Sequence, residues 1–155
     1  MTCRERLESY LRENGVPFRV DWHPLAYTAQ EVAAAEHVSG YLVAKPVIVR
    51  CEDGFVMAVL CAPQRLDLRK LQNLVGKPCR LAQESEFAPL FPDCEVGAQP
   101  PFGNLYGLAV YVDRRLAQDP EIVFRCGSHR ETMRVPYRDF ERLVRPVVAD
   151  LALEV

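Results

Sequence analysis

The sequence lacks the features that mark several large classes of protein. None of its apolar runs comes near the roughly 20 residues that a membrane-spanning helix needs. It has no internal repeat, no low-complexity tract and no stretch with the composition of a linker. Residues 1–6 run into an amphipathic pattern and not into the apolar core of a signal peptide. We therefore expect a single domain over residues 1–155, located in the cytoplasm and not bound to a membrane.

Signatures of familiar catalytic sites are missing as well. The sequence has no Gly-x-Ser-x-Gly elbow, no phosphate-binding loop, no metalloprotease helix and no dinucleotide fingerprint. Nucleophilic, metal and nucleotide chemistry therefore lack a positive signal. We expect neither a metal nor a cofactor.

The six cysteines show no metal-binding or redox spacing. No two stand as Cys-x-x-Cys, and none lies near a histidine in a ligand pattern. We expect reduced, mostly buried thiols, although a zinc site assembled from distant residues stays open. Cys94, beside a Gly/Pro loop, is either a nucleophile or a small apolar filler. The cysteines are Cys3, Cys51, Cys61, Cys79, Cys94 and Cys126.

The charge of the chain is close to balanced overall and positive in one segment. A net charge of −2 excludes a molecule that binds polyanions over its whole surface. Residues 125–145 differ, with six arginines against three carboxylates. If the segment from Tyr137 is helical, Arg138, Arg142 and Arg145 lie on one face. Such a stripe either grips phosphates or forms a solvated helix face.

The apolar periodicity and the Gly/Pro punctuation predict a mixture of helices and strands. Helices are expected over residues 3–14, 29–37, 68–75, 85–90 and 137–144, with capping residues at Thr28 and Asp67. Strands are expected over residues 17–22, 44–50, 55–60, 79–81, 108–112, 121–126 and 132–135. Hairpins with helices at the ends and between predict an α+β fold with a mixed, mostly antiparallel sheet.

Residues 95–103 form the most informative loop. Two glycines, Gly97 and Gly103, enclose the prolines Pro100 and Pro101. Proline fixes φ and removes a donor, while glycine permits positive φ and close approach of another group. The loop is therefore stiff, and it is either the wall of a pocket or a well-made turn between strands.

Two further positions carry polar chemistry. Lys45 interrupts an apolar strand, so its amine should reach a rim or a pocket, or else lie on a sheet edge. Gly127, Ser128 and His129 follow another strand, where the turn could aim N–H groups at a ligand. His129 could act as a hydrogen-bond partner or a base, or be an exposed turn residue.

Taken in order along the chain, these pieces resemble the YbaK/ProX family of aminoacyl-tRNA deacylases. The family is similar to the editing domain of prolyl-tRNA synthetase. The resemblance covers nearly the whole chain and rests on residues 37–40, 44–49, 66–71, 95–103, 110–113 and 122–129. It implies a mixed, partly rolled sheet surrounded by helices.

The resemblance also implies an activity and a site. The activity is hydrolysis in trans of mischarged tRNA that carries a small amino acid of the Ala, Cys or Ser class. The partners are the tRNA acceptor end and, as an open question, an aminoacyl-tRNA synthetase. The family's catalytic positions fall on Lys45, Gly97 and His129, and its substrate pocket falls on His23, Tyr27, Ala98, Pro100, Pro101, Gly103, Gly127 and Ser128. From the charge pattern, and not from the resemblance, we assign the contact with the tRNA acceptor stem to Arg138, Arg142 and Arg145.

One departure and three alternatives stay open. Pro46 follows the lysine where several editing proteins carry a polar residue, so the amino-acid preference is not fixed. The same pocket could belong to a non-catalytic module that binds aminoacyl esters or tRNA beside a synthetase. It could also serve a hydrolase of small free esters, or the chain could be a plain structural domain with Lys45 paired at the surface.

Overall fold

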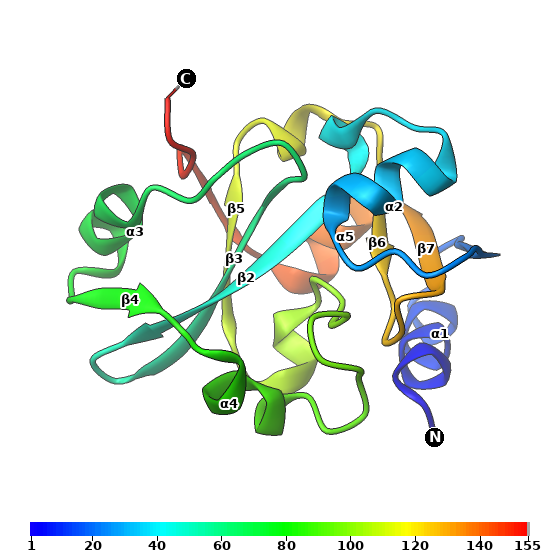
Figure 1. Ribbon diagram of the computed structural model, residues 1–155, viewed down its shortest axis with the longest axis horizontal. Helices are drawn as coiled ribbons and strands as arrows, with labels where there is room; N and C mark the ends of the chain where they lie inside the picture. Colours follow the sequence, from blue (N-terminus) through cyan, green and yellow to red (C-terminus); the bar gives the residue numbers. More distant parts are fainter. Residues whose placement is uncertain (155) are drawn as a thin grey trace.

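The chain folds into two open sheets with helices around them (Figure 1). The computed structural model describes residues 1–154, and Val155 lies outside them. The smaller sheet is antiparallel throughout, in the order β1-β7-β6. Its strands are β1 (Arg19–Trp22), β6 (Glu121–Arg125) and β7 (Glu131–Pro136).

The larger sheet has five strands in the order β4-β2-β3-β5-β8. β2 and β3 form the predicted hairpin, and β4 pairs antiparallel with β2. β5 pairs parallel with β3, and β8 pairs parallel with β5. The strands are β2 (Ala44–Cys51), β3 (Gly54–Cys61), β4 (Cys79–Leu81), β5 (Ala109–Asp113) and β8 (Val147–Ala149).

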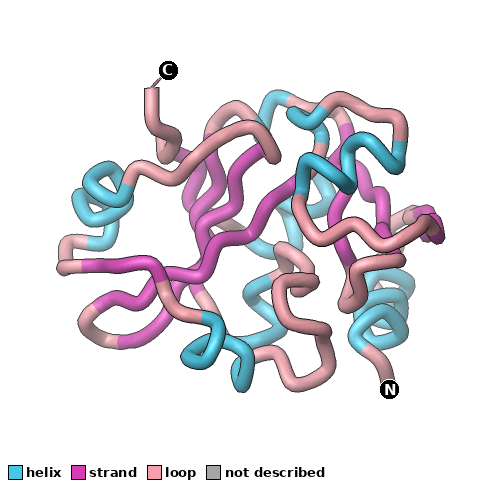
Figure 2. The backbone as a smooth tube through the Cα atoms, viewed as in Figure 1, coloured by secondary structure: helices cyan, strands magenta, loops and turns pink. Residues whose placement is uncertain are grey.

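Helices lie around both sheets (Figure 2). Thr2 and Thr28 each close a capping box with the glutamate three residues on, and Gly76 ends α3 at positive φ. The α-helices are α1 (Cys3–Glu13), α2 (Ala29–Glu36), α3 (Leu68–Val75), α4 (Glu84–Phe87) and α5 (Tyr137–Val144). Short 3₁₀ turns are η1 (Gly40–Leu42), η2 (Ala88–Leu90), η3 (Gly103–Tyr106) and η4 (Leu116–Gln118). Within residues 1–154 no helix combines the length and the apolar character needed to cross a bilayer.

The main core is shared by both sheets and the helices α1 and α5. Phe124 of β6 points into it, and the ring of Phe102 lies 5.5 Å from Phe124 and 5.2 Å from Phe140 of α5. Side chains alternate along a strand, so Val123 points the other way, where it is buried in a cluster with α2. α5 and α2 therefore cover opposite faces of the smaller sheet.

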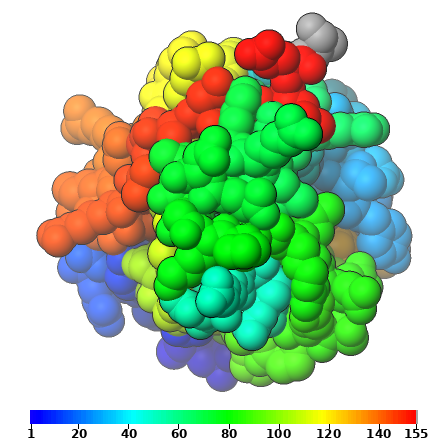
Figure 3. All heavy atoms as spheres, turned by 90° about the vertical axis from the view of Figure 1, so that its left-hand side faces the viewer, coloured from blue at the N-terminus to red at the C-terminus, as the bar shows by residue number. Residues whose placement is uncertain are grey.

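The larger sheet has a cover of its own. Leu71 of α3 shares one buried cluster with Leu60 of β3 and Leu151 near the C-terminus. Figure 3 looks at this side, where α3 (green) lies between the C-terminal segment (red) and the tip of the β2–β3 hairpin (cyan-green). α3 and the tip of the hairpin carry none of the predicted site residues.

The two sheets meet where β2 begins. A single parallel bridge joins Val43, just before β2, to Val123 in β6. Both valines belong to the buried cluster that faces α2. Because residues two apart in a strand share a face, Lys45 and Arg125 follow these valines on the side toward α2.

The predicted fold class is confirmed, with three details that differ. The strands form two open sheets and not one rolled sheet. The helix predicted over residues 85–90 divides into α4 and η2, since Pro89 lacks the N–H that would continue an α-helix. β8 is missing from the sequence prediction, because three residues after a helix-ending proline give too short a pattern.

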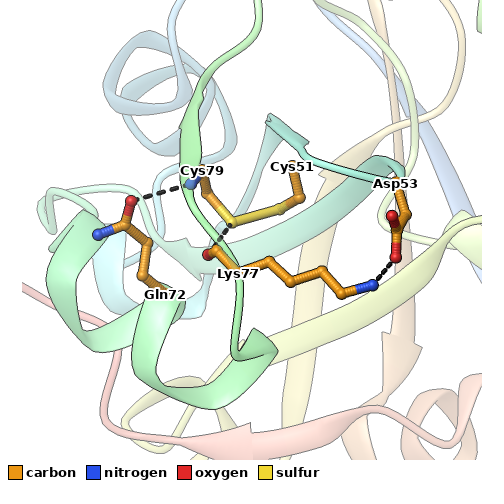
Figure 4. Close-up of a disulfide and its surroundings, with 5 residues drawn as sticks. All are labelled: Cys51, Asp53, Gln72, Lys77 and Cys79. Atoms are coloured by element: carbon orange, nitrogen blue, oxygen red, sulfur yellow. Dashed lines mark hydrogen bonds and ion pairs between the residues drawn. A yellow bond between two sulfur atoms is a disulfide. The ribbon is translucent and has the colours of Figure 1, made fainter.

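The expectation of reduced thiols is wrong for one pair of cysteines. Cys51 and Cys79 stand opposite each other on β2 and β4, with their Cα atoms 4.2 Å apart, and form a disulfide (Figure 4). Gln72 of α3 accepts the Cys79 N–H at 2.9 Å, which fixes β4 beside the helix. The pairing depends on strand register across 28 residues, which no local spacing reveals. The other four cysteines are free, and three of them are buried.

Candidate functional site

The turn after β6 is joined to the Gly/Pro loop by main-chain hydrogen bonds. The Glu95 N–H donates to the Gly127 carbonyl at 2.8 Å, and the Gly127 N–H donates to the Ala98 carbonyl at 2.9 Å. Residues 95–98 and 127–129, which the family resemblance assigned to one site, therefore form one rigid unit.

The loop between β1 and α2 closes the other side of the same turn. The His23 N–H donates to the Arg130 carbonyl and the Ala26 N–H donates to the His129 carbonyl, both at 2.9 Å. The ring of Tyr27 lies 4.9 Å from that of His129 and is largely exposed. The structure thus places His23 and Tyr27 at the turn, and their role in binding a substrate stays a prediction.

Glycine is required at three positions for different reasons. Gly97 and Gly127 have φ of +83° and +107°, which other residues rarely adopt. A Cβ on Gly127 would also stand 2.6 Å from the Cβ of Cys3. Gly103 has ordinary φ, but its Cβ would lie 2.7 Å from a methyl of Val110. Gly103 is therefore needed for close packing against Val110, whereas Gly97 and Gly127 give the two turns their backbone conformation.

Not every N–H of the two turns is available to a ligand. The N–H groups of Ala98 and Gly127 donate to the carbonyls of Glu95 and Ala98. The N–H groups of Gly97 and Ser128 have no hydrogen-bond partner in residues 1–154. The donors that remain for a substrate oxygen are thus those of Gly97 and Ser128.

His129 is buried, in contrast to the exposed turn residue that was one of its expected states. Its Nε2 lies 2.8 Å from the Val96 carbonyl, so Nε2 carries the proton and donates. Its Nδ1 then accepts from Arg125 Nη1 at 3.4 Å. The Glu95 carboxylate accepts the main-chain N–H of His129 at 3.4 Å. With both ring nitrogens engaged, His129 holds the turns together.

Arg125 is a site residue that the sequence did not single out. Its Nη1 donates to the Tyr27 carbonyl at 2.5 Å and reaches His129. Burial lowers the pKa of Arg125, with a small opposing effect of Glu31. No carboxylate in residues 1–154 lies within 4.0 Å of its guanidinium. A charged residue among Val123, Phe124 and the other buried positions of β6 was the available signal.

Lys45 is half-buried and also lacks a carboxylate within 4.0 Å in the described chain. Its Nζ donates to the Ala62 carbonyl at 3.1 Å and to the Gln64 carbonyl. Burial lowers the pKa of Lys45, and the nearby charge of Arg65 lowers it further. An ammonium has three donors, so one remains for a ligand.

The remaining predicted pocket residues are well ordered by packing. Ala98, Pro100 and Pro101, which belong to the Gly/Pro loop, are buried. His23 Nδ1 donates to the Pro24 carbonyl, 2.7 Å away, while its Nε2 is buried without a partner in residues 1–154. Its free ring nitrogen is the polar group of this region that a ligand would satisfy.

The arginine stripe on α5 lies away from this site. Arg138, Arg142 and Arg145 are exposed. α5 packs on the face of the smaller sheet that carries Phe124, opposite the face of Arg125. Arg142 is partly neutralised by Asp139 at 3.3 Å. A contact of this stripe with tRNA stays a prediction and would involve a part of the tRNA beyond its reacting end.

Comparison with known proteins connects this geometry to a family. The model of the family described as "Aminoacyl-tRNA editing domain" matches residues 23–143, which include every segment of the site. No curated protein matches the sequence significantly. Among solved structures, one described as "a putative trans-editing enzyme for prolyl tRNA synthetase" is 28% identical with a TM-score of 0.86, and the match covers 99% of each chain.

Two other solved structures have the same fold. A hypothetical protein, APE2540, is 25% identical with a TM-score of 0.86, over 96% of this chain and 99% of its own. A scaffold used for epitope backbone grafting is 26% identical with a TM-score of 0.86, over 100% of this chain and 99% of its own. The likeness extends over whole chains and is not confined to the site.

Proposed function

Because the chain belongs to the aminoacyl-tRNA editing domain family, we propose that it is a trans-editing deacylase. It hydrolyses, in the cytoplasm, the ester of a mischarged tRNA that carries a small amino acid. The observation that carries the proposal is an unpaired cation, Arg125, at two glycine turns with unused N–H groups, with a second unpaired cation, Lys45, on the adjoining strand β2. Cations and free N–H donors favour a substrate that carries negative charge and gains further negative charge in the transition state.

The two cations would hold the negative end of the substrate. The 3′ end of tRNA brings phosphate close to the ester, and partly buried cations bind phosphate more strongly than exposed ones. Arg125 offers a planar fork of donors and Lys45 a compact charge. Neither must first release a carboxylate, although Lys45 would share its amine with two carbonyls.

The turns would stabilise the transition state. Ester hydrolysis builds negative charge on the carbonyl oxygen, and fixed donors aimed at that oxygen lower the barrier. The N–H groups of Gly97 and Ser128 are the candidates, with Lys45 adding charge. An aminoacyl ester is reactive, so the attacking water needs orientation more than a strong base. A backbone carbonyl or the 2′-hydroxyl of the substrate would supply it, while His129 keeps the turns in place.

Selection of the amino acid would work by exclusion. The prolines of the 97–103 loop are buried and stiff, so the loop cannot yield to a large side chain. A rigid pocket rejects bulky groups by clash but separates neighbours that differ by one methylene only about 10–200-fold. We therefore expect activity on several small amino acids of the Ala, Cys and Ser class.

The decisive experiment measures deacylation of a panel of mischarged tRNAs by the purified protein. Removing one transition-state donor costs roughly 10²–10³ in rate, so we expect at least that loss in Lys45→Ala. Lys77→Ala is the matched control, because Lys77 is an exposed lysine paired with Asp53 at the tip of the β2–β3 hairpin (Figure 4). It should deacylate at the parent rate.

Other outcomes would replace the proposal. Binding of mischarged tRNA without hydrolysis would identify a non-catalytic module that works beside a synthetase. Equal hydrolysis of small free esters, with no gain from the RNA, would identify a small-ester hydrolase. Parent activity in Lys45→Ala would remove Lys45 from the mechanism.

A further inference from the structure

A second group of reactive side chains lies on the outer side of the glycine turns. Cys3 begins α1, while Asp93 and Cys94 stand just before the Gly/Pro loop. The two sulfur atoms and a carboxylate oxygen of Asp93 all lie within 4.8 Å of one another. The group is assembled from segments 90 residues apart, and the proposed deacylation uses none of its members.

The surroundings of this group resemble those of a metal site. The Tyr106 hydroxyl donates to Asp93 Oδ1 at 3.0 Å and lies 3.5 Å from the Cys3 sulfur and 3.6 Å from that of Cys94. Arg6 lies 3.7 Å from Asp93 Oδ2 and stacks 4.8 Å above the Tyr106 ring. These are the groups that orient and neutralise a negatively charged ligand set.

The ligand atoms are also open to solvent on one side. They line a cavity of about 390 Å³ whose other walls include Cys126 and the main chain of Gly127 and Ser128. Cys3 is buried, whereas Cys94 and Asp93 are half-buried. An ion can therefore enter without unfolding the chain, and a water can complete its coordination.

We propose that Cys3, Asp93 and Cys94 bind a thiophilic divalent cation, with Zn²⁺ as the natural occupant. Zn²⁺ takes four ligands from thiolates, imidazoles and carboxylates, with Zn–S distances of about 2.3 Å. Tetrahedral geometry then separates two sulfur ligands by about 3.8 Å. The present separations need only small side-chain rotations. Two thiolates and a carboxylate leave a bound Zn²⁺ with one excess negative charge, which Arg6 offsets.

The position of this site gives the ion a structural role. Gly127 packs so closely on Cys3 that a Cβ there would stand 2.6 Å from that of Cys3. Glu95, the residue after Cys94, bonds through its N–H to the Gly127 carbonyl. A cation would thus tie the start of α1 to both glycine turns. The proposal does not depend on deacylation and stands if that function fails.

The test is a titration of metal-free, reduced protein with Co²⁺ alone and with Zn²⁺ alone. Because reduction frees Cys51 and Cys79, the titration uses the C51S/C79S background. We expect one Co²⁺ per chain, with a thiolate-to-metal charge-transfer band and the visible bands of four-coordinate cobalt, displaced by Zn²⁺. Cys3→Ser and Cys94→Ser should each abolish the band. Cys61→Ala should keep it, since Cys61 is buried elsewhere.

A subtler variant separates binding from folding. Tyr106→Phe removes only the hydroxyl that orients Asp93, so we expect the cobalt spectrum to persist with about 10–100-fold weaker affinity. In the natural sequence, Zn²⁺ should protect Cys3 and Cys94 from alkylation, as read by peptide mass spectrometry. This measurement needs no variant to fold.

Three results would overturn the metal site. The first is the absence of stoichiometric binding. The second is a cobalt band that survives in both Cys3→Ser and Cys94→Ser. The third is a Cys3–Cys94 disulfide in freshly isolated, metal-free protein, because the same sulfur atoms would then serve as a thiol pair.

Discussion

The combination of an unpaired charge and a pKa lowered by burial distinguishes Lys45 and Arg125 from the other cations in residues 1–154. Most arginines in residues 1–154 stand in ion pairs, such as Arg4 with Glu8 and Arg80 with Glu86. Lys45 and Arg125 do not, and burial lowers the pKa of both. Desolvating an unpaired charge opposes folding, so such groups are more typical of function than of stability.

This contrast predicts the behaviour of Arg125→Gln. The amide can still donate to the Tyr27 carbonyl, but the charge is lost. A hydrogen bond to a charged group contributes about 1.5–3 kcal/mol, so kcat/KM for mischarged tRNA should fall about 10–100-fold. The free energy of unfolding should change by less than about 1 kcal/mol, because no partner charge is left behind. Deacylation assays and urea denaturation measure the two effects.

The matched control is Arg114→Gln, since Arg114 is an exposed arginine on the larger sheet's side, 3.6 Å from Asp150. It should leave both quantities unchanged. If Arg125→Gln loses several kcal/mol of stability together with its activity, Arg125 is a structural residue and not a ligand for substrate.

Single residues could be predicted only where their chemistry was conspicuous. Gly97, Gly127 and Lys45 stand out from their neighbours in the sequence. The burial of His129 could not be predicted, because it depends on Val96 from a distant loop. Arg125 was not predicted as a site residue, because a single charged residue at the end of an apolar strand usually marks only the point where the strand ends.

At the scale of elements, local signals located nearly every helix and strand. Thr28 with Glu31 began α2, and Asp67 with Gly76 enclosed α3, because caps satisfy groups that the helix itself leaves open. Where the local signal was short or depended on a partner strand, prediction failed. β8 and the disulfide both depend on which strands lie side by side, and the local sequence does not show that.

The disulfide gives a prediction for an element far from the site. It joins β4, an edge strand of three residues, to β2 and closes a separation of 28 residues. Loop closure of that size contributes about 3.6 kcal/mol in the chain-entropy account. C51S/C79S should therefore lower the free energy of unfolding by about that amount in urea denaturation. Deacylation at 25 °C should be unchanged, because the pair lies on the side away from the turns.

Reduced natural protein is the internal comparison for that experiment. Its unfolding should coincide with that of C51S/C79S, while the oxidised protein stays more stable. A variant that lost deacylation while still folded would connect β4 to the site, contrary to the arrangement described here.

At the scale of the whole molecule, the arrangement of the two sheets determines which side chains lie close enough to share a site. One bridge between Val43 and Val123, 80 residues apart, sets the lysine strand beside the strand of Arg125. No periodicity or motif encodes that contact, so composition and pattern predicted the class of fold but not its two-sheet form. The resemblance to a family assigned the Gly/Pro loop and the turn after β6 to one site, and main-chain hydrogen bonds join these two segments. That Lys45 acts with them stays a prediction.

The same arrangement separates the arginine stripe from the chemistry and makes its role testable. The side chains of Arg138 and Arg145 make no hydrogen bond or ion pair in residues 1–154, whereas Arg142 is paired with Asp139. If the tRNA body rests on α5, Arg138→Gln/Arg145→Gln should weaken tRNA binding and reduce the salt slope of log K by about 2 in total, near 0.9 per phosphate contact. Arg142→Gln should matter less, and hydrolysis of a small aminoacyl ester should not change.

Arg12→Gln/Arg114→Gln removes the same charge from other exposed surfaces and serves as the control for net charge. An equal loss of affinity in both double variants would mean that only the overall charge matters. An unchanged salt slope in Arg138→Gln/Arg145→Gln would place the tRNA on the α2 side, where the cations of the site already lie. Because α2 and α5 cover opposite faces of one thin sheet, the salt slope distinguishes these two orientations directly.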